Sequence, residues 1–141
     1  MTAYLDTSSL VKLYVAEGGT ETVQRLVSDA TVVATSQIAY PETRAALVRR
    51  RREGALATSA FAIAKRAFDT DWTKYLAVEV TASLCREAGE LAEQLHLRGY
   101  DSVHLASFAE VVRRAGAGRT RFSSYDDALN RASRSILREL R

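Results

Sequence analysis

Near its start the chain reads Tyr4-Leu5-Asp6-Thr7-Ser8-Ser9-Leu10-Val11-Lys12, a short apolar run that ends at a carboxylate and a group of hydroxyl side chains. Residues 3–5 are apolar and predict a short buried strand that stops at Asp6. Ser8 or Ser9 is expected to cap a short helix over residues 10–15. The chain thus begins with a strand that leads directly into a helix.

The rest of the sequence continues this alternation. Further strands are predicted at residues 31–35, 75–80 and, more weakly, 121–124. Helices are predicted from residue 20, over 42–52 and 58–69, from 81 or 83 to 97, over 101–114 and over 126–140. Strands that alternate with helices imply a parallel sheet covered on both faces. With 141 residues, one proline and seven glycines, residues 1–141 are expected to form a single α/β domain.

Several classes of protein are disfavoured by the sequence. No segment approaches the roughly 18–20 apolar residues of a membrane span, and Asp6 and Lys12 interrupt any apolar core of a signal peptide. The expected location is therefore cytoplasmic. Cys85 is the only cysteine, so an intrachain disulfide is excluded, and we expect it to be a small core residue.

The charge suggests a polyanionic partner. There are 20 Lys and Arg residues against 17 Asp and Glu residues, a net charge of +3. Only three of the 20 are lysines, and the planar guanidinium of arginine matches phosphate geometry well. A basic bias also occurs in proteins that bind no nucleic acid, so the charge alone leaves the partner open.

Four acidic residues from distant segments are candidates for one site. Asp6 and Asp126 directly follow the first and last predicted strands, while Glu42 and Asp101 lie in the opening turns of predicted helices. Ligands of open α/β sheets bind at the carboxyl ends of the strands, so these acids are expected to converge. Taken singly, each acid is equally well explained as a helix cap or as a partner of the helix dipole. Asp127 leaves the position of the fourth acid open by one residue, although the spacing to Leu129 favours Asp126.

The segments around these acids show a recognisable pattern. The blocks are Tyr4-Leu5-Asp6-Thr7-Ser8-Ser9-Leu10, Pro41-Glu42-Thr43-Arg44-Ala45-Ala46-Leu47, Tyr100-Asp101-Ser102-Val103-His104-Leu105-Ala106 and Ser123-Ser124-Tyr125-Asp126-Asp127-Ala128-Leu129. In this order they resemble the four blocks of the PIN-domain nucleases. Within that family the chain is most similar to the toxins of VapBC toxin–antitoxin pairs, which have about this length.

The resemblance implies a fold and an activity. The fold would be a three-layer α/β/α sandwich around a parallel sheet of four or five strands. The activity would be Mg²⁺- or Mn²⁺-dependent cleavage of RNA, with the metal held by Asp6, Glu42, Asp101 and Asp126. Ser124 and Thr7 would support this site, and the partners would be a VapB-like antitoxin and a second copy of the chain.

The chemistry of the residues agrees with that expectation. Mg²⁺ prefers oxygen ligands and needs neither Cys nor His. Neighbouring carboxylates repel one another unless a cation balances them. Among the basic residues, Arg44, Arg49 and Arg50 are the candidates for binding RNA, and His104 is expected to be a packed or hydrogen-bonding residue rather than a metal ligand.

Other functions fit the sequence less well. A haloacid-dehalogenase phosphatase needs Asp-x-Asp, but position 8 is serine. A receiver-like signalling domain needs an acidic pair before its first helix, and a nucleotide-driven enzyme needs a glycine-rich phosphate loop. Neither pattern occurs. The remaining alternative is a PIN fold with weak catalysis that serves as a scaffold for RNA or protein.

Overall fold

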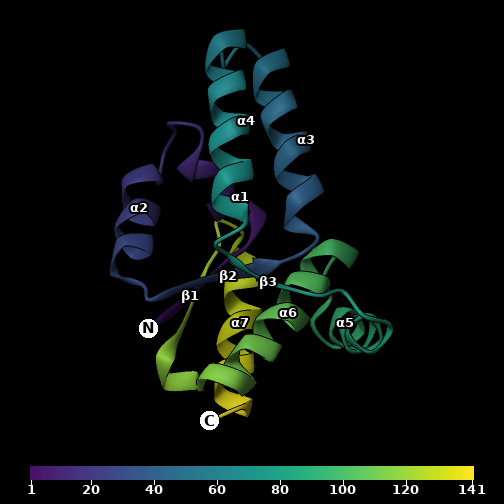
Figure 1. Ribbon diagram of the computed structural model, residues 1–141. Coiled ribbons are helices and arrows are strands. Elements are labelled where there is room, and N and C mark those ends of the chain that lie inside the picture. The colour runs from purple at the N-terminus through teal and green to yellow at the C-terminus, as the bar shows by residue number, and fades with distance from the viewer.

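Four parallel strands form the centre of the computed structural model, which describes residues 1–141 (Figure 1). The strands are β1 (Thr2–Leu5), β2 (Val32–Ser36), β3 (Leu76–Val78) and β4 (Thr120–Ser123), and their order in the sheet is β3-β2-β1-β4. The predicted parallel sheet is confirmed, and the strand count lies at the lower end of the expected range. All connections between neighbouring strands contain helices, as parallel pairing requires.

The helices alternate with the strands, as predicted. They are α1 (Thr7–Leu10), α2 (Thr20–Asp29), α3 (Ala39–Arg52), α4 (Thr58–Trp72), α5 (Ala82–Leu95), α6 (Gly99–Ala115) and α7 (Asp127–Glu139), with short 3₁₀ turns η1 (Val11–Leu13) and η2 (Ala117–Arg119). None of them is both long enough and apolar enough to cross a bilayer.

The alternation of side chains along β1 separates the molecule into layers. Ala3 and Leu5 face one side of the sheet, where they pack with Val23 of α2 and Phe68 of α4. Tyr4 points to the other side and joins a larger cluster of buried residues from α5, α6 and α7, among them Leu91, Phe108 and Leu129. Because every member of these clusters is buried, the sheet is covered on both faces, and the expected three-layer sandwich is confirmed.

Helices α3 and α4 form a hairpin that extends beyond the sheet (Figure 1). A separate cluster holds the hairpin together: Leu47 of α3, Leu56 of the connecting loop and Ala64 of α4 pack with Val11 and Val15. This cluster attaches the hairpin to the segment after β1. Ala39 in the first turn of α3 packs in the same cluster as Leu5, so this turn lies close to the end of β1.

The starts of three helices differ from the predictions. Asp6, rather than Ser8 or Ser9, caps α1 by accepting a hydrogen bond from the Ser9 N–H. Helix α3 begins at Ala39, so residues 39 and 40 belong to its first turn instead of an irregular one. Pro41 is tolerated there because a first-turn residue needs no N–H donor, and the first regular bond runs from Glu42 N–H to Ile38 C=O at 3.3 Å.

Helix α6 also begins earlier than predicted, at Gly99. Its cap is Arg98, so Asp101 is the third residue of the helix and does not cap it. Gly99 was expected to end the preceding helix, but α5 ends at Leu95 and is capped by His96, whose φ of 53° is left-handed. Cys85 is exposed on α5, and the prediction that it is a core residue was wrong. The buried side of α5, which packs against α6, is made by Ala88 and Leu91 instead.

Candidate active site

A cleft of about 570 Å³ opens where β1 and β4 end and where α3 and α6 begin. All four predicted acids line it, namely Asp6, Glu42, Asp101 and Asp126. The register pairs Leu5 with Ser123, so the two strands end at the same edge of the sheet and bring their following residues together. The convergence expected from the sequence is present, and we call this space the acidic cleft.

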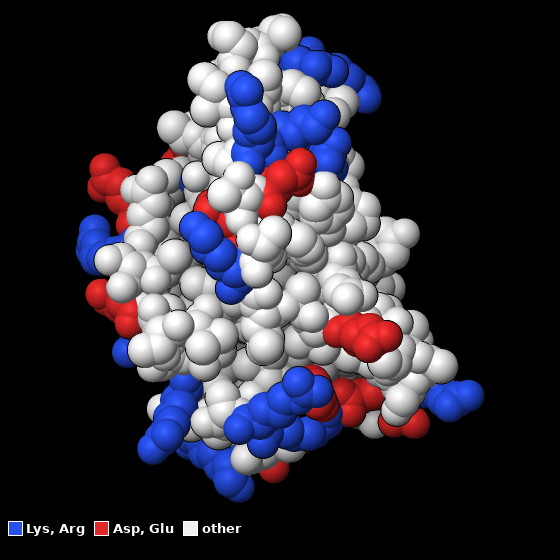
Figure 2. Space-filling model, in the orientation of Figure 1, with Lys and Arg blue, Asp and Glu red and all other residues white.

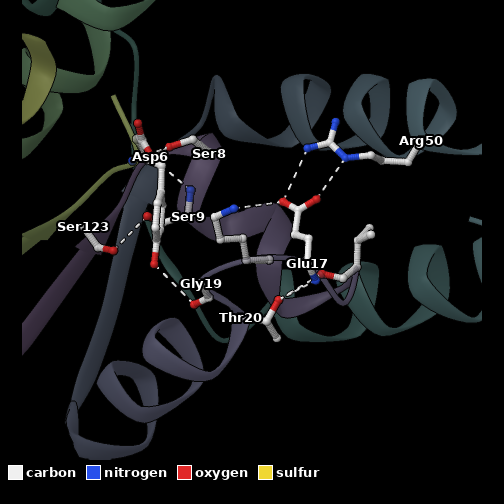
Figure 3. Close-up of polar contacts among 11 residues, drawn as sticks. Asp6, Ser8, Ser9, Glu17, Gly19, Thr20, Arg50 and Ser123 are labelled. Atoms are coloured by element: carbon white, nitrogen blue, oxygen red, sulfur yellow. Dashed lines mark hydrogen bonds and ion pairs between the residues drawn. The ribbon is translucent and has the colours of Figure 1, made fainter. Parts of the chain in front are cut away.

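Asp6 is the most buried of the four acids, with 5% of the residue exposed. Its Oδ1 accepts hydrogen bonds from Ser8 Oγ at 2.7 Å and from the Ser9 N–H at 3.1 Å, and its Oδ2 accepts one from Ser124 Oγ at 2.6 Å. The surroundings of Asp6, Ser8 and Ser9 are drawn in Figure 3. Burial raises the pKa of Asp6, and the hydroxyl groups of Ser124 and Ser8 offset only part of that rise. A nearby cation would favour the ionised form.

Ser124 connects the first and fourth acids. Besides donating to Asp6, its Oγ accepts a hydrogen bond from the Asp126 N–H at 3.0 Å. Asp126 caps α7 through a 2.8 Å bond from the Leu129 N–H to Oδ1, which leaves Oδ2 toward the cleft rim. Asp127 is exposed and is absent from the cleft lining. Of the two adjacent acids, only Asp126 therefore belongs to the cleft.

Glu42 is held by a chain of hydrogen bonds that starts in the core. The Glu42 Oε1 atom lies 2.6 Å from Thr7 Oγ1 and 2.8 Å from His104 Nε2. On the other side of the ring, His104 Nδ1 lies 2.9 Å from the hydroxyl of the fully buried Tyr4. Because a carboxylate only accepts, His104 Nε2 donates to Glu42, and in the neutral imidazole Nδ1 then accepts from the Tyr4 hydroxyl.

This chain of bonds determines the charge of Glu42. Burial alone would raise the pKa of Glu42, but the hydrogen bonds from His104 and Thr7 outweigh it, and the pKa falls below its ordinary value. His104 is thus a hydrogen-bonding residue, as the sequence predicted. Thr7 contacts an acid of the cleft directly, which agrees with its predicted supporting position.

Arg98 joins the two acids at the exposed side of the cleft. Its Nε lies 3.1 Å from Asp101 Oδ2, and one of its terminal nitrogens lies 3.7 Å from Asp126 Oδ2. The Arg98 side chain is 82% exposed, so the pairing is largely hydrated and contributes little to stability. Arg98 nevertheless supplies positive charge between two carboxylates that would otherwise repel each other.

The donor set of the cleft suits a hard divalent cation. Its acids offer only oxygen ligands, which Mg²⁺ prefers, and the raised pKa of Asp6 indicates a carboxyl that a cation would help to ionise. In the present arrangement, however, no three Asp, Glu, His or Cys side chains lie close enough to hold one ion together. Arg98 is engaged with two of the acids, so ion binding requires at least these side chains to turn.

The predicted arginines fall in different places. Arg49 and Arg50, near the end of α3, line the acidic cleft, and Figure 2 shows basic side chains gathered over the α3–α4 part of the molecule beside acidic ones. Arg50 is oriented by Glu17, whose Oε2 lies 3.2 Å from Nε (Figure 3). Arg44 does not line the cleft, because its guanidinium faces α4 and contacts the Tyr40 hydroxyl at 2.7 Å and Asp69 at 3.7 Å. Arg44 thus lies outside the cleft, and its contact with RNA stays a prediction.

Four further residues of the cleft were not identified as site residues from the sequence. His104 was expected to form hydrogen bonds, but its bond to Glu42 spans 62 residues and has no local signal. The same holds for the bridge that Arg98 makes to Asp126. Tyr100 and Tyr125 also line the cleft. Their one signal in the sequence is that each stands immediately before a predicted acid.

A parallel α/β sandwich with carboxylates gathered at the carboxyl edge of its sheet agrees with the class of protein that the sequence blocks resemble. The chain belongs to the PIN-domain family, whose family model matches residues 3–134. The ribonucleases VapC45 and VapC49 of Mycobacterium tuberculosis, from strains CDC 1551 / Oshkosh and H37Rv, are each 40% identical to it over 104 residues. The alignments cover 74% of this chain and 72% of each relative.

A solved structure shares the fold. The crystal structure of Mycobacterium tuberculosis VapC20, described as a sarcin-ricin loop cleaving toxin, superposes with a TM-score of 0.68 at 24% identity. The match covers 92% of this chain and 94% of VapC20. It confirms the PIN-like architecture that the sequence predicted.

Proposed function

We propose that this chain is a metal-dependent endoribonuclease of the VapC kind, the toxin of a type II toxin–antitoxin pair, acting on RNA in the cytoplasm. The observation that carries the proposal is the gathering of Asp6, Glu42, Asp101 and Asp126 in one cleft. Membership of the PIN-domain family and the similarity to two proteins named ribonucleases support it.

The acids divide naturally into two roles. Asp6, Glu42 and Asp101 would hold the principal Mg²⁺ or Mn²⁺, and Asp126 would assist a water or a second ion. When bound, the metal would lower the pKa of a water and balance the charge of the phosphate under attack. Such a route leaves a 5′-phosphate and a 3′-hydroxyl, whereas a cyclic phosphate end would indicate metal-free attack by the 2′-hydroxyl.

The chain prepares two of these acids in different ways. Glu42 is kept ionised near neutral pH, because His104 and Thr7 lower its pKa. Asp6 is fixed in orientation by Ser8 and Ser124 but is penalised by burial in its charged form. A bound cation is therefore expected to stabilise the ionised form of Asp6 most strongly. Glu42 can bind the cation without a change in its own protonation.

Arg49 and Arg50 are suited to bind the phosphates of the RNA. Both line the cleft, and the guanidinium fork matches phosphate oxygens. Glu17 limits the freedom of Arg50, since it accepts from two of its nitrogens at 3.2 and 3.5 Å. The side chain is thus held over the α3 wall of the cleft before RNA arrives.

RNA cleavage by the purified protein tests the proposal. Wild type, Asp6→Asn, Asp101→Asn and Asp127→Asn are compared in Mg²⁺, in Mn²⁺ and in EDTA. The expected result is metal-dependent cutting that the first two substitutions abolish and that Asp127→Asn preserves, because Asp127 lies outside the cleft although it carries the same charge. If structured and unstructured RNAs all stay intact and Mg²⁺ does not raise the Tm, the chain is a scaffold and the proposal fails.

The partners follow from the same resemblance. A VapB-like antitoxin encoded beside this chain would cover the acidic cleft, and a second copy of the chain would form a homodimer. Co-expression with the product of an adjacent small gene should yield a complex with suppressed ribonuclease activity. Sedimentation equilibrium of the free chain should give twice the mass of 15.5 kDa.

A further inference from the structure

The outer face of α7 carries a row of arginines. The buried residues of this helix recur at every third or fourth position from Leu129 to Ile136. With 3.6 residues per turn, the exposed residues Arg131, Arg134 and Arg138 lie on the opposite side of the helix. We call these three residues the α7 arginine stripe. Most surface helices have one apolar and one charged side, so the position of the stripe alone does not indicate a function.

The stripe differs from an ordinary charged face because no acid balances it. Arg114 on α6 shows the usual arrangement, since Glu110, four residues before it, accepts from its Nε at 2.9 Å. None of the stripe arginines forms an ion pair, although Asp127 stands one turn before the stripe. The only side-chain hydrogen bond of the stripe runs from Arg138 to the Ser135 hydroxyl at 3.1 Å. The three guanidinium groups are therefore free to bind an external anion.

The charges of the stripe also repel one another. Arg131 and Arg134 are three positions apart, Arg134 and Arg138 are four apart, and like charges at such spacings destabilise a helix. A polyanion that lies along the helix would remove this repulsion. The whole final segment has the same bias, because residues 119–141 contain six arginines and three acids. Their net charge of +3 equals that of the entire chain, so residues 1–118 are balanced.

The stripe starts near the acidic cleft and leads away from it. Asp126 lines the cleft and caps α7, and Figure 1 shows α7 running from the middle of the molecule to the C-terminus. Arg131 stands five residues after Asp126, a rise of about 8 Å, and the stripe extends about 10 Å further. A stacked strand advances about 3.4 Å per nucleotide, so the stripe has the length of about three nucleotides.

A row of phosphates matches this surface better than a protein does. None of the exposed large apolar residues of the chain lies on α7, so the face lacks the anchors around which protein interfaces form. A second copy of the chain would bring the same positive charge to it. A guanidinium group, in contrast, binds phosphate oxygens through two parallel hydrogen bonds, and all three residues of the stripe are arginines.

We propose that the α7 arginine stripe is a second RNA-binding surface, which holds the phosphates of the strand where it leaves the acidic cleft past Asp126. The inference rests on the proposed function and adds to it a surface outside the cleft. Contacts to phosphates position a strand without reading its bases. The stripe should therefore strengthen the binding of RNA and leave the chemical step to the residues of the cleft.

Equilibrium binding in EDTA tests the surface, because metal-dependent cutting is suppressed there. The probe is a fluorescein-labelled 16-nucleotide oligouridylate, titrated at several salt concentrations. Arg131→Gln/Arg134→Gln/Arg138→Gln removes the three charges and retains a similar helix propensity. Each lost phosphate contact lowers the slope of log K against log salt by about 0.7, so this variant should lose about 2 in slope. Its loss of affinity should then be about 20-fold larger at 50 mM than at 200 mM salt.

A matched control removes the same charge elsewhere. Arg25→Gln/Arg66→Gln/Arg86→Gln replaces three exposed arginines of α2, α4 and α5 that form no ion pair and do not line the cleft. It should lose much less slope than the stripe variant, because screening by salt weakens the effect of distant charges. Thermal melts verify that both variants are folded. In Mg²⁺, the stripe variant should raise the KM for the same strand with little change in kcat.

The outcomes separate this inference from the proposed function. If the two triple variants lose the same slope, or if neither loses any, the stripe is not a binding surface and the inference is refuted. An affinity that falls while KM stays constant also refutes it, because the stripe would then hold an anion other than the substrate. Displacement of the RNA by a 16-residue oligoglutamate as effectively as by unlabelled RNA would point to an acidic protein and overturn it as well. If the wild type cuts no RNA, the proposed function fails, whereas the binding measurements still decide whether the stripe holds RNA.

Discussion

The hydrogen bond between Tyr4 and His104 links the core of the sheet to Glu42, and a double-mutant cycle can measure its strength. Both side chains are buried, at 0% and 2% exposure, and their atoms lie 2.9 Å apart. Thr43 Oγ1 is the only buried side-chain polar atom without a hydrogen-bond partner in the whole chain. Tyr4→Phe or His104→Leu alone would therefore create a new unpaired polar group in the core.

The expected magnitudes follow from that burial. A buried polar group that loses its partner costs about 1–3 kcal/mol, so each single variant should lose about that much of its free energy of unfolding. Tyr4→Phe/His104→Leu removes both polar groups and should cost about 1–2 kcal/mol less than the sum of the two. Neither substitution changes the side-chain volume greatly, so the cavity contribution is small.

Urea unfolding followed by circular dichroism measures all four corners of the cycle. With a slope of about 2 kcal/mol per molar urea, a 2 kcal/mol loss shifts the midpoint by about 1 M. The His104→Leu variant should also cut RNA more slowly than Tyr4→Phe does, because Glu42 loses a hydrogen-bond donor only in His104→Leu. Strict additivity of the stability losses would refute the reasoning, because it would mean that the two groups do not depend on each other.

Four further predictions concern the charged groups of the cleft. In EDTA, Asp6→Asn should raise the Tm at pH 7. Burial raises the pKa of Asp6, so the protonated carboxyl stabilises the fold below the unfolded pKa, and this stability is lost as the pH rises through the folded pKa. Glu42→Gln should lower the Tm at pH 7, because the pKa of Glu42 is lowered and its stabilising effect disappears only as pH falls through the folded pKa. Arg98→Ala should tighten Mn²⁺ binding in calorimetric titrations with a change in stability under about 1 kcal/mol, since its exposed guanidinium competes for two acids. The double charge reversal Arg49→Glu/Arg50→Glu should weaken RNA binding and lower the slope of log K against log salt by roughly 1–1.5.

Three of these predictions have a control variant. Asp127→Asn makes the same change of charge outside the cleft and should leave the Tm at pH 7 close to that of the wild type, and the Asp6 reasoning is wrong if Asp6→Asn behaves the same way. Arg98→Lys retains the charge and should bind Mn²⁺ almost as wild type does. Arg44→Glu adds negative charge on the same helix outside the cleft, so an equal loss of RNA affinity there would contradict a specific role for the cleft arginines.

The sequence by itself determined the class of fold and predicted four acids that the structure places in one cleft. The apolar run before Asp6 and the β-branched run at residues 31–35 are local signals of buried strands, and their alternation with amphipathic helices permits few arrangements other than a parallel sheet. Strand ends lie at one edge of such a sheet, so Asp6 and Asp126 could be expected to meet. Local patterns of this kind depend on neighbouring residues alone and are readable without coordinates.

Only the tertiary structure decided how the cleft is built. The bonds from Ser124 to Asp6 and from His104 to Glu42 join residues 118 and 62 positions apart, and neither residue carries a local mark of its partner. The displacement of Arg44 from the cleft depends on the packing of α3 against α4, which turns its side chain to Asp69. Cys85 is exposed because Ala88 and Leu91 occupy the side of α5 that meets the core. The direction of each side chain and its pairing with distant residues depend on how the helices and strands pack. Local sequence patterns therefore do not predict them.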